Sequence, residues 1–181
     1  MRAKAGRGYV DDPEAGRPLM GSLIIVNNLQ VAFVAFALGI TGIGTVITLV
    51  FNGVLFGGVL GLYAAKGIAQ LILAFVAPHG VLELSAIAIA GGAGLLLTTA
   101  LLLPGTQTRR DALMANATRA LKLIVCAIVF MLIAGMLEGL VSPIPWWPIE
   151  WKAMVAFATF VVMIGYLSLG RRRTATTLPS T

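Results

Sequence analysis

The chain reads PLMGSLIIVNNLQVAFVAFALGITGIGTVITLVFNGVLFGGVLGLYAA from Pro18 to Ala65 without one charged side chain. Two further stretches, 84–108 and 153–170, also lack charge. A transmembrane helix needs about 20 predominantly apolar residues to cross about 30 Å of hydrocarbon, so each stretch can hold at least one. Backbone groups in lipid must be bonded internally, and these stretches are too long for barrel strands. The sequence therefore predicts membrane-spanning helices.

Composition supports this interpretation. Of the 181 residues, 59% are hydrophobic and 11% are charged, whereas a soluble domain carries about 25% charged residues. Too few polar side chains remain to cover a water-facing surface, which excludes a soluble globular enzyme. Cys126 is the only cysteine, which excludes a disulfide scaffold. The fold class expected is an all-α, polytopic transmembrane bundle of about five spans with glycine-rich packing.

The expected boundaries follow from charges and turn residues. Breaks are predicted at Asn52-Gly53, at Pro78-His79-Gly80, at Pro104-Gly105 and over Ser142–Pro148. The expected organisation is a polar exposed tail over 1–22, a transmembrane domain over 23–170 and a basic polar tail over 171–181. The spans expected within that domain are 23–51, 53–77, 80–103, 119–141 and 152–170.

Basic residues lie at the ends of the apolar runs, so they indicate membrane topology and no nucleic-acid contact is expected. Seven of them fall on the side of the C-terminus and five on the side of the N-terminus, with Lys66 left unassigned. This favours a cytoplasmic C-terminus and an external N-terminal tail in the cytoplasmic membrane. An external start suggests that an earlier span is missing from this chain.

Five polar or charged residues fall inside the predicted transmembrane domain, where charge is costly. His79 and Glu83 are four residues apart and share a helix face; they form either a structural pair or a proton relay or metal ligand pair. Glu138 lies near the end of the fourth span, either meeting that pair or extending to the outer interface. The amides of Asn28 and Asn52 are expected to bond across helices. These five residues make up the predicted intramembrane polar cluster.

Small residues predict where helices pack closely, since close backbone approach drives helix association in lipid. Gly53, Gly57 and Gly61 form a repeated small-xxx-small ridge, which implies a tightly packed bundle, a homo-oligomer face, or both. The other residues assigned to packing or turns are Gly39, Gly44, Pro78, Gly80, Gly91, Gly94, Gly135, Gly139 and Pro143. None of these residues is expected to take part in a chemical reaction.

The chain has no nucleotide-binding loop, no HExxH, no GxSxG and no CxxC pattern. One histidine leaves the scattered serines and threonines without a second base. We therefore expect no enzyme, no catalytic residue, no metal site and no cofactor.

Five stretches in order resemble the stage II sporulation protein M family: 27–45 (NNLQVAFVAFALGITGIGT), 52–61 (NGVLFGGVLG), 78–95 (PHGVLELSAIAIAGGAGL), 104–105 (PG) and 134–143 (AGMLEGLVSP). The resemblance implies an integral, non-enzymatic protein of the cytoplasmic membrane. The family's namesake is a scaffold that places cell-wall hydrolases at the septum. Members usually carry an additional span and an external segment ahead of the NNL stretch, which this chain lacks.

Two functions are weighed. The first is a scaffold or assembly factor for envelope remodelling, whose partners are the lipid bilayer and other membrane or envelope proteins, cell-wall hydrolases among them. The second is an ion- or proton-coupled transporter or channel that uses His79, Glu83 and Glu138, since acidic residues and imidazoles beside broken helices are common at such sites. Solute flux separates the two.

Overall fold

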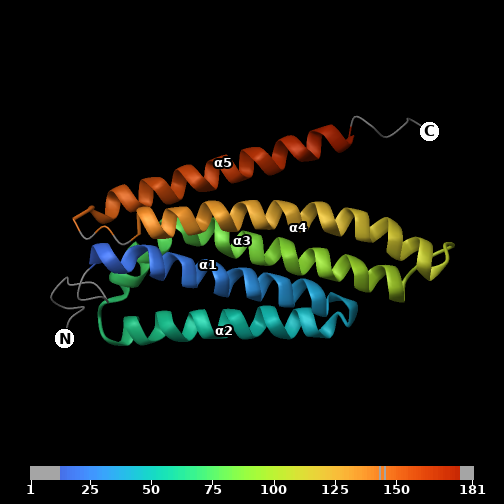
Figure 1. Ribbon diagram of the computed structural model, residues 1–181, viewed down its shortest axis with the longest axis horizontal. Helices are drawn as coiled ribbons and strands as arrows, with labels where there is room; N and C mark the ends of the chain where they lie inside the picture. The colour runs from blue at the N-terminus through green and yellow to red at the C-terminus, as the bar shows by residue number, and fades with distance from the viewer. Residues whose placement is uncertain (1–12, 143, 145, 176–181) are drawn as a thin grey trace.

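The computed structural model describes residues 13–142, 144 and 146–175, and these form an all-α bundle (Figure 1). No strand occurs within those ranges. Five α-helices and one short 3-10 helix follow one another along the chain: α1 (Pro13–Ala37), η2 (Leu38–Ile40), α2 (Ile43–Ala65), α3 (Ala69–Leu102), α4 (Arg109–Leu140) and α5 (Ile149–Ala175).

Four of the helices are long and apolar enough to cross a membrane. The segments that qualify in the described part of the chain are Ile43–Ala65, Ala69–Leu102, Arg109–Leu140 and Ile149–Ser168. A shorter apolar helical segment covers Ile25–Ile40, within α1 and η2. The all-α membrane bundle predicted from composition is therefore confirmed.

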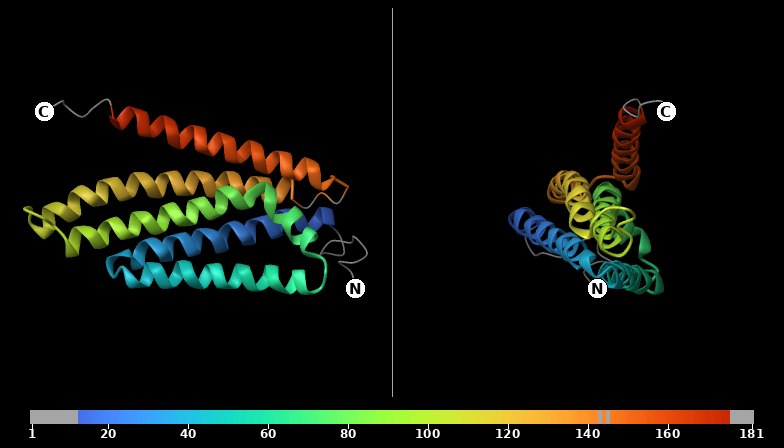
Figure 2. Two further views of the ribbon diagram at one scale, coloured as in Figure 1. Left: turned by 180° about the vertical axis from the view of Figure 1, so that it is seen from behind. Right: turned by 90° about the vertical axis from the view of Figure 1, so that its right-hand side faces the viewer.

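The helices run alternately in opposite directions, so the start of α1 and the end of α5 lie at opposite ends of the bundle (Figure 1). The antiparallel pair α3 and α4 makes the most extensive contact, and α1 packs against both. The α2 helix packs on α1 and α3, on the side away from α4 (Figures 1 and 2). The last helix, α5, packs on α3 and diverges from the other four (Figure 2).

The break predicted at Asn52-Gly53 is wrong, because both residues lie inside α2. The chain turns earlier, at Thr41-Gly42, where Gly42 adopts φ +70°. The Thr41 hydroxyl stabilises this turn by donating to the Leu38 carbonyl at 2.7 Å and accepting from the Gly44 amide at 3.0 Å. An Asn-Gly pair marks a turn in water, but in lipid the backbone keeps its helical hydrogen bonds wherever it can.

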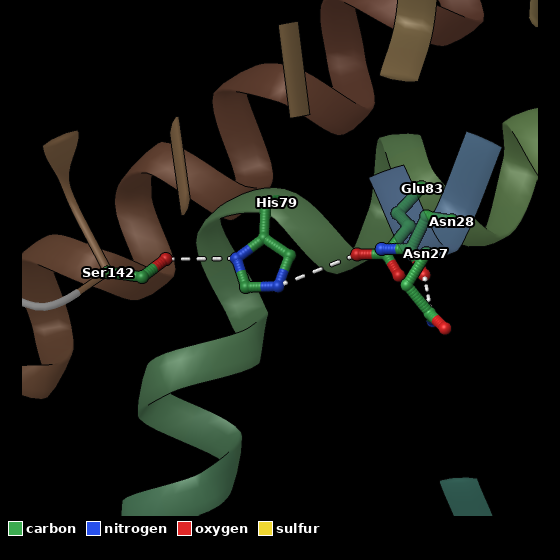
Figure 3. A network of polar contacts seen from close by, with 5 residues as sticks. All are labelled: Asn27, Asn28, His79, Glu83 and Ser142. Carbon is green, nitrogen blue, oxygen red and sulfur yellow. Dashed lines mark hydrogen bonds and ion pairs between the residues drawn. The ribbon is translucent and has the colours of Figure 1, made fainter. Parts of the chain in front are cut away.

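The break predicted at Pro78-His79-Gly80 is also wrong, since α3 continues through Pro78. Proline cannot donate a backbone hydrogen bond, and the helix changes direction at this point instead of ending (Figures 2 and 3). The true connection is at Lys66–Ile68. There the Gly67 amide bonds to the Ala64 carbonyl and the Ile68 amide to the Tyr63 carbonyl, with Gly67 at φ +67°. This is the Schellman arrangement that ends helices at glycine.

The outer boundaries also differ from those predicted. Residues 13–22, expected in a polar tail, belong to α1, and residues 171–175 continue α5. The α4 helix begins at Arg109 and not at 119, because the Thr108 hydroxyl caps it by accepting from the Asp111 amide at 3.2 Å. The predicted tail residues 1–12 and 176–181, together with Pro143, lie outside the described residues.

Alanines form the contact between α3 and α4. Buried alanines recur every seven residues on both helices, which is nearly two helical turns and keeps them on one face: Ala86, Ala93 and Ala100 on α3, and Ala120, Ala127 and Ala134 on α4. Each is at most 3% exposed. Such small side chains allow two backbones to approach closely, as helix pairs in lipid require. The sequence reasoning missed this repeat, although the spacing is legible in the chain.

Glycines complete the packing at specific points. A methyl group added to Gly94 would stand 2.8 Å from the Phe36 carbonyl oxygen, and one added to Gly39 would collide with the backbone of Gly94. Gly91 lies under Leu49 of α2, and Gly135 under Ile25 of α1. In contrast, four predicted packing glycines have no neighbouring atom within 4 Å of an added Cβ in the described part of the chain: Gly53, Gly57, Gly61 and Gly139.

Candidate functional site

Polar side chains gather at one end of the bundle, where α3 bends and α4 ends. His79 is 3% exposed and lies in α3 directly after Pro78. Its Nδ1 atom is 2.9 Å from the Ser142 hydroxyl oxygen, and its Nε2 atom is 3.6 Å from Glu83 Oε2 (Figure 3). Phe75 packs edge-on against the imidazole, with ring centroids 5.8 Å apart. The ring is therefore held between a hydroxyl and a carboxylate.

The helical geometry of α3 explains the His79–Glu83 pair. Residues four apart stand on one helix face, so the two side chains meet as the sequence predicted. The bend at Pro78 directs the His79 ring toward the connection that follows α4, in which Ser142 lies (Figure 3). Ser142 lies just after α4, and its amide is bonded to the Leu137 carbonyl at 3.1 Å. No sequence pattern singled out this serine.

Glu138 is the second carboxylate of the region. It lies in the last turn of α4 and is only 3% exposed. Its Oε1 atom is buried and has no hydrogen-bond partner among the described residues. The sequence predicted that Glu138 either joins the pair or extends to the interface, and in the structure its side chain is buried.

Lys152 belongs to the same end of the bundle and was missed by the sequence analysis. It lies in the first turn of α5 and is 7% exposed. Its Nζ atom donates to the Ser142 carbonyl oxygen at 2.8 Å. Ser142 therefore contacts His79 through its hydroxyl and Lys152 through its carbonyl. A lysine this near the start of an apolar helix, after a proline-rich connection, was the available signal.

The two predicted asparagines are placed differently. Asn28 of α1 is 9% exposed, and its Oδ1 atom accepts from Asn27 Nδ2 at 3.3 Å. Both amides lie on the Glu83 side of the His79 ring (Figure 3). Asn52 is separate, because it sits midway along α2, a helix that contacts α1 and α3 but neither α4 nor α5 within the described residues.

The arrangement brings together side chains that can exchange protons. Among the described residues, no three His, Cys, Asp or Glu side chains come together in a group that could bind a metal ion. One imidazole, two carboxyl groups and one hydroxyl remain, all of which exchange protons. Ionisable groups at membrane depth are costly, and they mark functional sites more often than structural ones.

Comparison with known proteins identifies the family of this chain. The profile described as "Stage II sporulation protein M" matches residues 4–143. The chain belongs to the stage II sporulation protein M family. The matched region covers α1 to α4 and therefore contains His79, Glu83, Glu138 and Ser142, whereas Lys152 lies beyond it.

A relative of this stage II sporulation protein M family member is known from an archaeon. The uncharacterized protein MJ0793 of Methanocaldococcus jannaschii is 32% identical over 123 residues, which cover 66% of this chain and 69% of that protein. No solved structure matches the chain. With four helices able to span a membrane, this family member is a membrane protein.

Proposed function

We propose that this chain is a non-enzymatic scaffold of the cytoplasmic membrane, which assembles other membrane or envelope proteins along its α2 helix. The supporting observation is the outward surface of α2. Only 6% of its apolar window is buried in the bundle. Its inward side carries Thr45, Leu49 and Asn52, which are buried or half-buried, and the glycine ridge lies beside this stripe.

The ridge itself, Gly53, Gly57 and Gly61, is exposed. Apart from the adjacent residues and backbone of α2 itself, no atom of the described residues lies within 4 Å of where a side chain would begin. These glycines are therefore not needed for helix contacts among the described residues, whereas Gly91 and Gly94 are. In lipid, three glycines at four-residue spacing allow a second helix to approach the backbone closely. Large apolar residues flank the ridge, among them Val54 and Leu62, and would contact the arriving helix.

The test is Gly57→Leu, because a leucine there fills open space and leaves the bundle intact. A photo-reactive residue at Val54 in native membranes would report which proteins contact α2. We expect Gly57→Leu to reduce the yield of crosslinked protein about tenfold, which corresponds to about 1.4 kcal/mol of association. Gly92→Leu is the matched control, since Gly92 is exposed on α3 with equally open space. Adducts with lipid alone would contradict the proposal.

A second candidate, ion- or proton-coupled transport, is supported by the His79–Glu83 pair and by the buried Glu138, whose Oε1 atom has no hydrogen-bond partner among the described residues. It predicts proton or small-ion flux into liposomes that contain the purified protein, lost in Glu138→Gln. The scaffold predicts no flux above empty liposomes, with partner capture unaffected by the same substitution. Measuring both quantities on one pair of variants separates the two functions.

A further inference from the structure

Two basic residues of α4, Arg119 and Lys122, lie well inside the level at which the helices of the bundle end. The Asn116 side-chain amide of α4 donates to the Leu96 carbonyl oxygen of α3 at 3.0 Å, which fixes the register of this antiparallel pair. Arg119 and Lys122 follow three and six residues later on α4. Because the two helices run in opposite directions, the two cations lie level with residues 90–93 of α3.

That part of α3 lies at the depth of an apolar span. Gly91 packs under Leu49 of α2, and Leu49 comes six residues after the start of α2 at Ile43, about 9 Å along the helix. With its 23 residues, α2 is about 34 Å long and only slightly exceeds a hydrocarbon layer of about 30 Å. The level of Leu49, and with it that of Lys122, therefore falls inside the membrane.

The charges of α4 itself lead to the same depth. Between Lys122 and Glu138 the helix carries only the uncharged residues 123–137, so about 24 Å separates the two charged residues along the helix. This is less than the hydrocarbon thickness of about 30 Å. The Glu138 side chain is buried within the bundle, whereas Arg119 and Lys122 are exposed on its surface. The two cations therefore face lipid.

Neither cation is neutralised by the protein. Within the described part of the chain, no acidic side chain forms an ion pair with Arg119 or Lys122. Asp111 lies two turns away on α4, where its carboxylate accepts from the Thr108 hydroxyl at 2.6 Å. A charge at membrane depth is costly unless it is paired, and a long basic side chain lowers this cost by extending toward the headgroups. Standing three residues apart, the two cations lie on one side of α4 and can extend together.

Apolar side chains continue this side of α4 toward the membrane centre. Val125, Val129 and Ile133 follow Lys122 at three- and four-residue spacing, which keeps them near the same helix face. Their exposed fractions are 55, 47 and 42%, so neighbouring helices do not cover them. The surface thus combines two cations at one end with an apolar stripe below them. A phospholipid has the matching form, with a charged headgroup above acyl chains.

We propose that Arg119 and Lys122 bind the headgroup phosphate of an anionic phospholipid whose acyl chains lie along Val125, Val129 and Ile133. The phosphate supplies the negative charge that the described residues do not offer to these cations, and it accepts hydrogen bonds from both. A zwitterionic lipid is a poorer occupant, because its own cation neutralises its phosphate. The site does not rest on the proposed scaffold role of α2.

The experiment places a photo-reactive residue at Val125 of the full chain, in nanodiscs of phosphatidylcholine with a minor fraction of phosphatidylglycerol. Mass spectrometry of the crosslinked protein then gives the ratio of the two lipids bound at that position. We expect phosphatidylglycerol to exceed its bulk ratio at least about fivefold, the gain that one basic residue near an anionic surface provides. The same probe at Leu55, exposed midway along α2, should report the bulk ratio. A bulk ratio at Val125 would overturn the site.

Paired substitutions locate the charge that is responsible. Arg119→Gln combined with Lys122→Gln should return the ratio at Val125 to the bulk value. The matched control, Arg109→Gln with Arg110→Gln, removes the same charge from exposed positions at the start of α4 and should leave the enrichment in place. Enrichment that persists in the first pair, or that falls equally in both, contradicts a site at Arg119 and Lys122.

A charge-conserving exchange separates binding from packing. Arg119→Lys with Lys122→Arg keeps both cations and should keep the enrichment, and its loss there would contradict a site based on charge. Circular dichroism and elution volume in detergent show that each variant keeps its fold. None of these results depends on whether Gly57→Leu loses its partners.

Discussion

At Gly94, a single absent methyl group sets how closely α1 and α3 approach. The carbonyl oxygens of Phe36 and Ala35 would lie 2.8 and 2.9 Å from an added Cβ atom, and both belong to backbone that cannot rotate away. One of those carbonyls, that of Ala35, also accepts a buried hydrogen bond from Thr45 at 2.6 Å. The Gly39 carbonyl accepts from the Thr98 hydroxyl in the same contact. Three helical segments therefore meet at this glycine.

We predict that Gly94→Ala lowers the free energy of unfolding by about 1–3 kcal/mol, the usual cost of inserting a carbon into a packed interior. Thermal unfolding in detergent, followed by circular dichroism, measures the change. Gly92→Ala is the matched control: it lies two residues away on the same helix, with open space above it, and should unfold within about 0.5 kcal/mol of the wild type. Equal losses in the two variants would show that the close contact at Gly94 is not responsible.

The polar site could be predicted from single residues only in part. His79 and Glu83 were paired correctly because both lie on one helix, where spacing alone fixes their distance. Ser142 reaches the same ring from 63 positions away, and its contact depends on how α4 packs against α3. Lys152 is linked to this site by a hydrogen bond to the backbone carbonyl of Ser142, and a side chain–backbone bond of this kind cannot be predicted from the residue types. Local geometry is legible in a sequence, while tertiary register is not.

The elements show the same division. The apolar stretches predicted the helical class of the fold, because an apolar stretch in lipid must be helical. The breaks at Asn52-Gly53 and Pro78 were misplaced, because a backbone carbonyl that leaves a helix in lipid finds no water to bond. Residues that form turns in water therefore stay helical there. The real turns fall at Gly42 and Gly67, the two glycines with positive φ between α1 and α3. Gly42 is surrounded by other glycines, so nothing in the sequence distinguishes the one that turns.

At the scale of the whole molecule, the basic residues are distributed unequally between the two ends of the bundle. Lys66, which the sequence left unassigned, is exposed in the connection between α2 and α3, at the end of the bundle where α5 begins. Within the described residues that end holds Arg17, Lys66 and Lys152. The opposite end holds seven basic residues at or near the ends of helices: Arg109, Arg110, Arg119, Lys122, Arg171, Arg172 and Arg173.

This asymmetry predicts an orientation, because basic residues near span ends remain in the cytoplasm. In a Cys126→Ala background, we expect Ala65→Cys to react with a membrane-impermeant maleimide in intact cells. Gln107→Cys, in the exposed connection between α3 and α4, should react only after permeabilisation. Leu55→Cys, exposed midway along α2, should stay unlabelled in both conditions because lipid covers it. The reverse pattern would place the end of the bundle that holds His79, Glu83 and Ser142 at the cytoplasmic face.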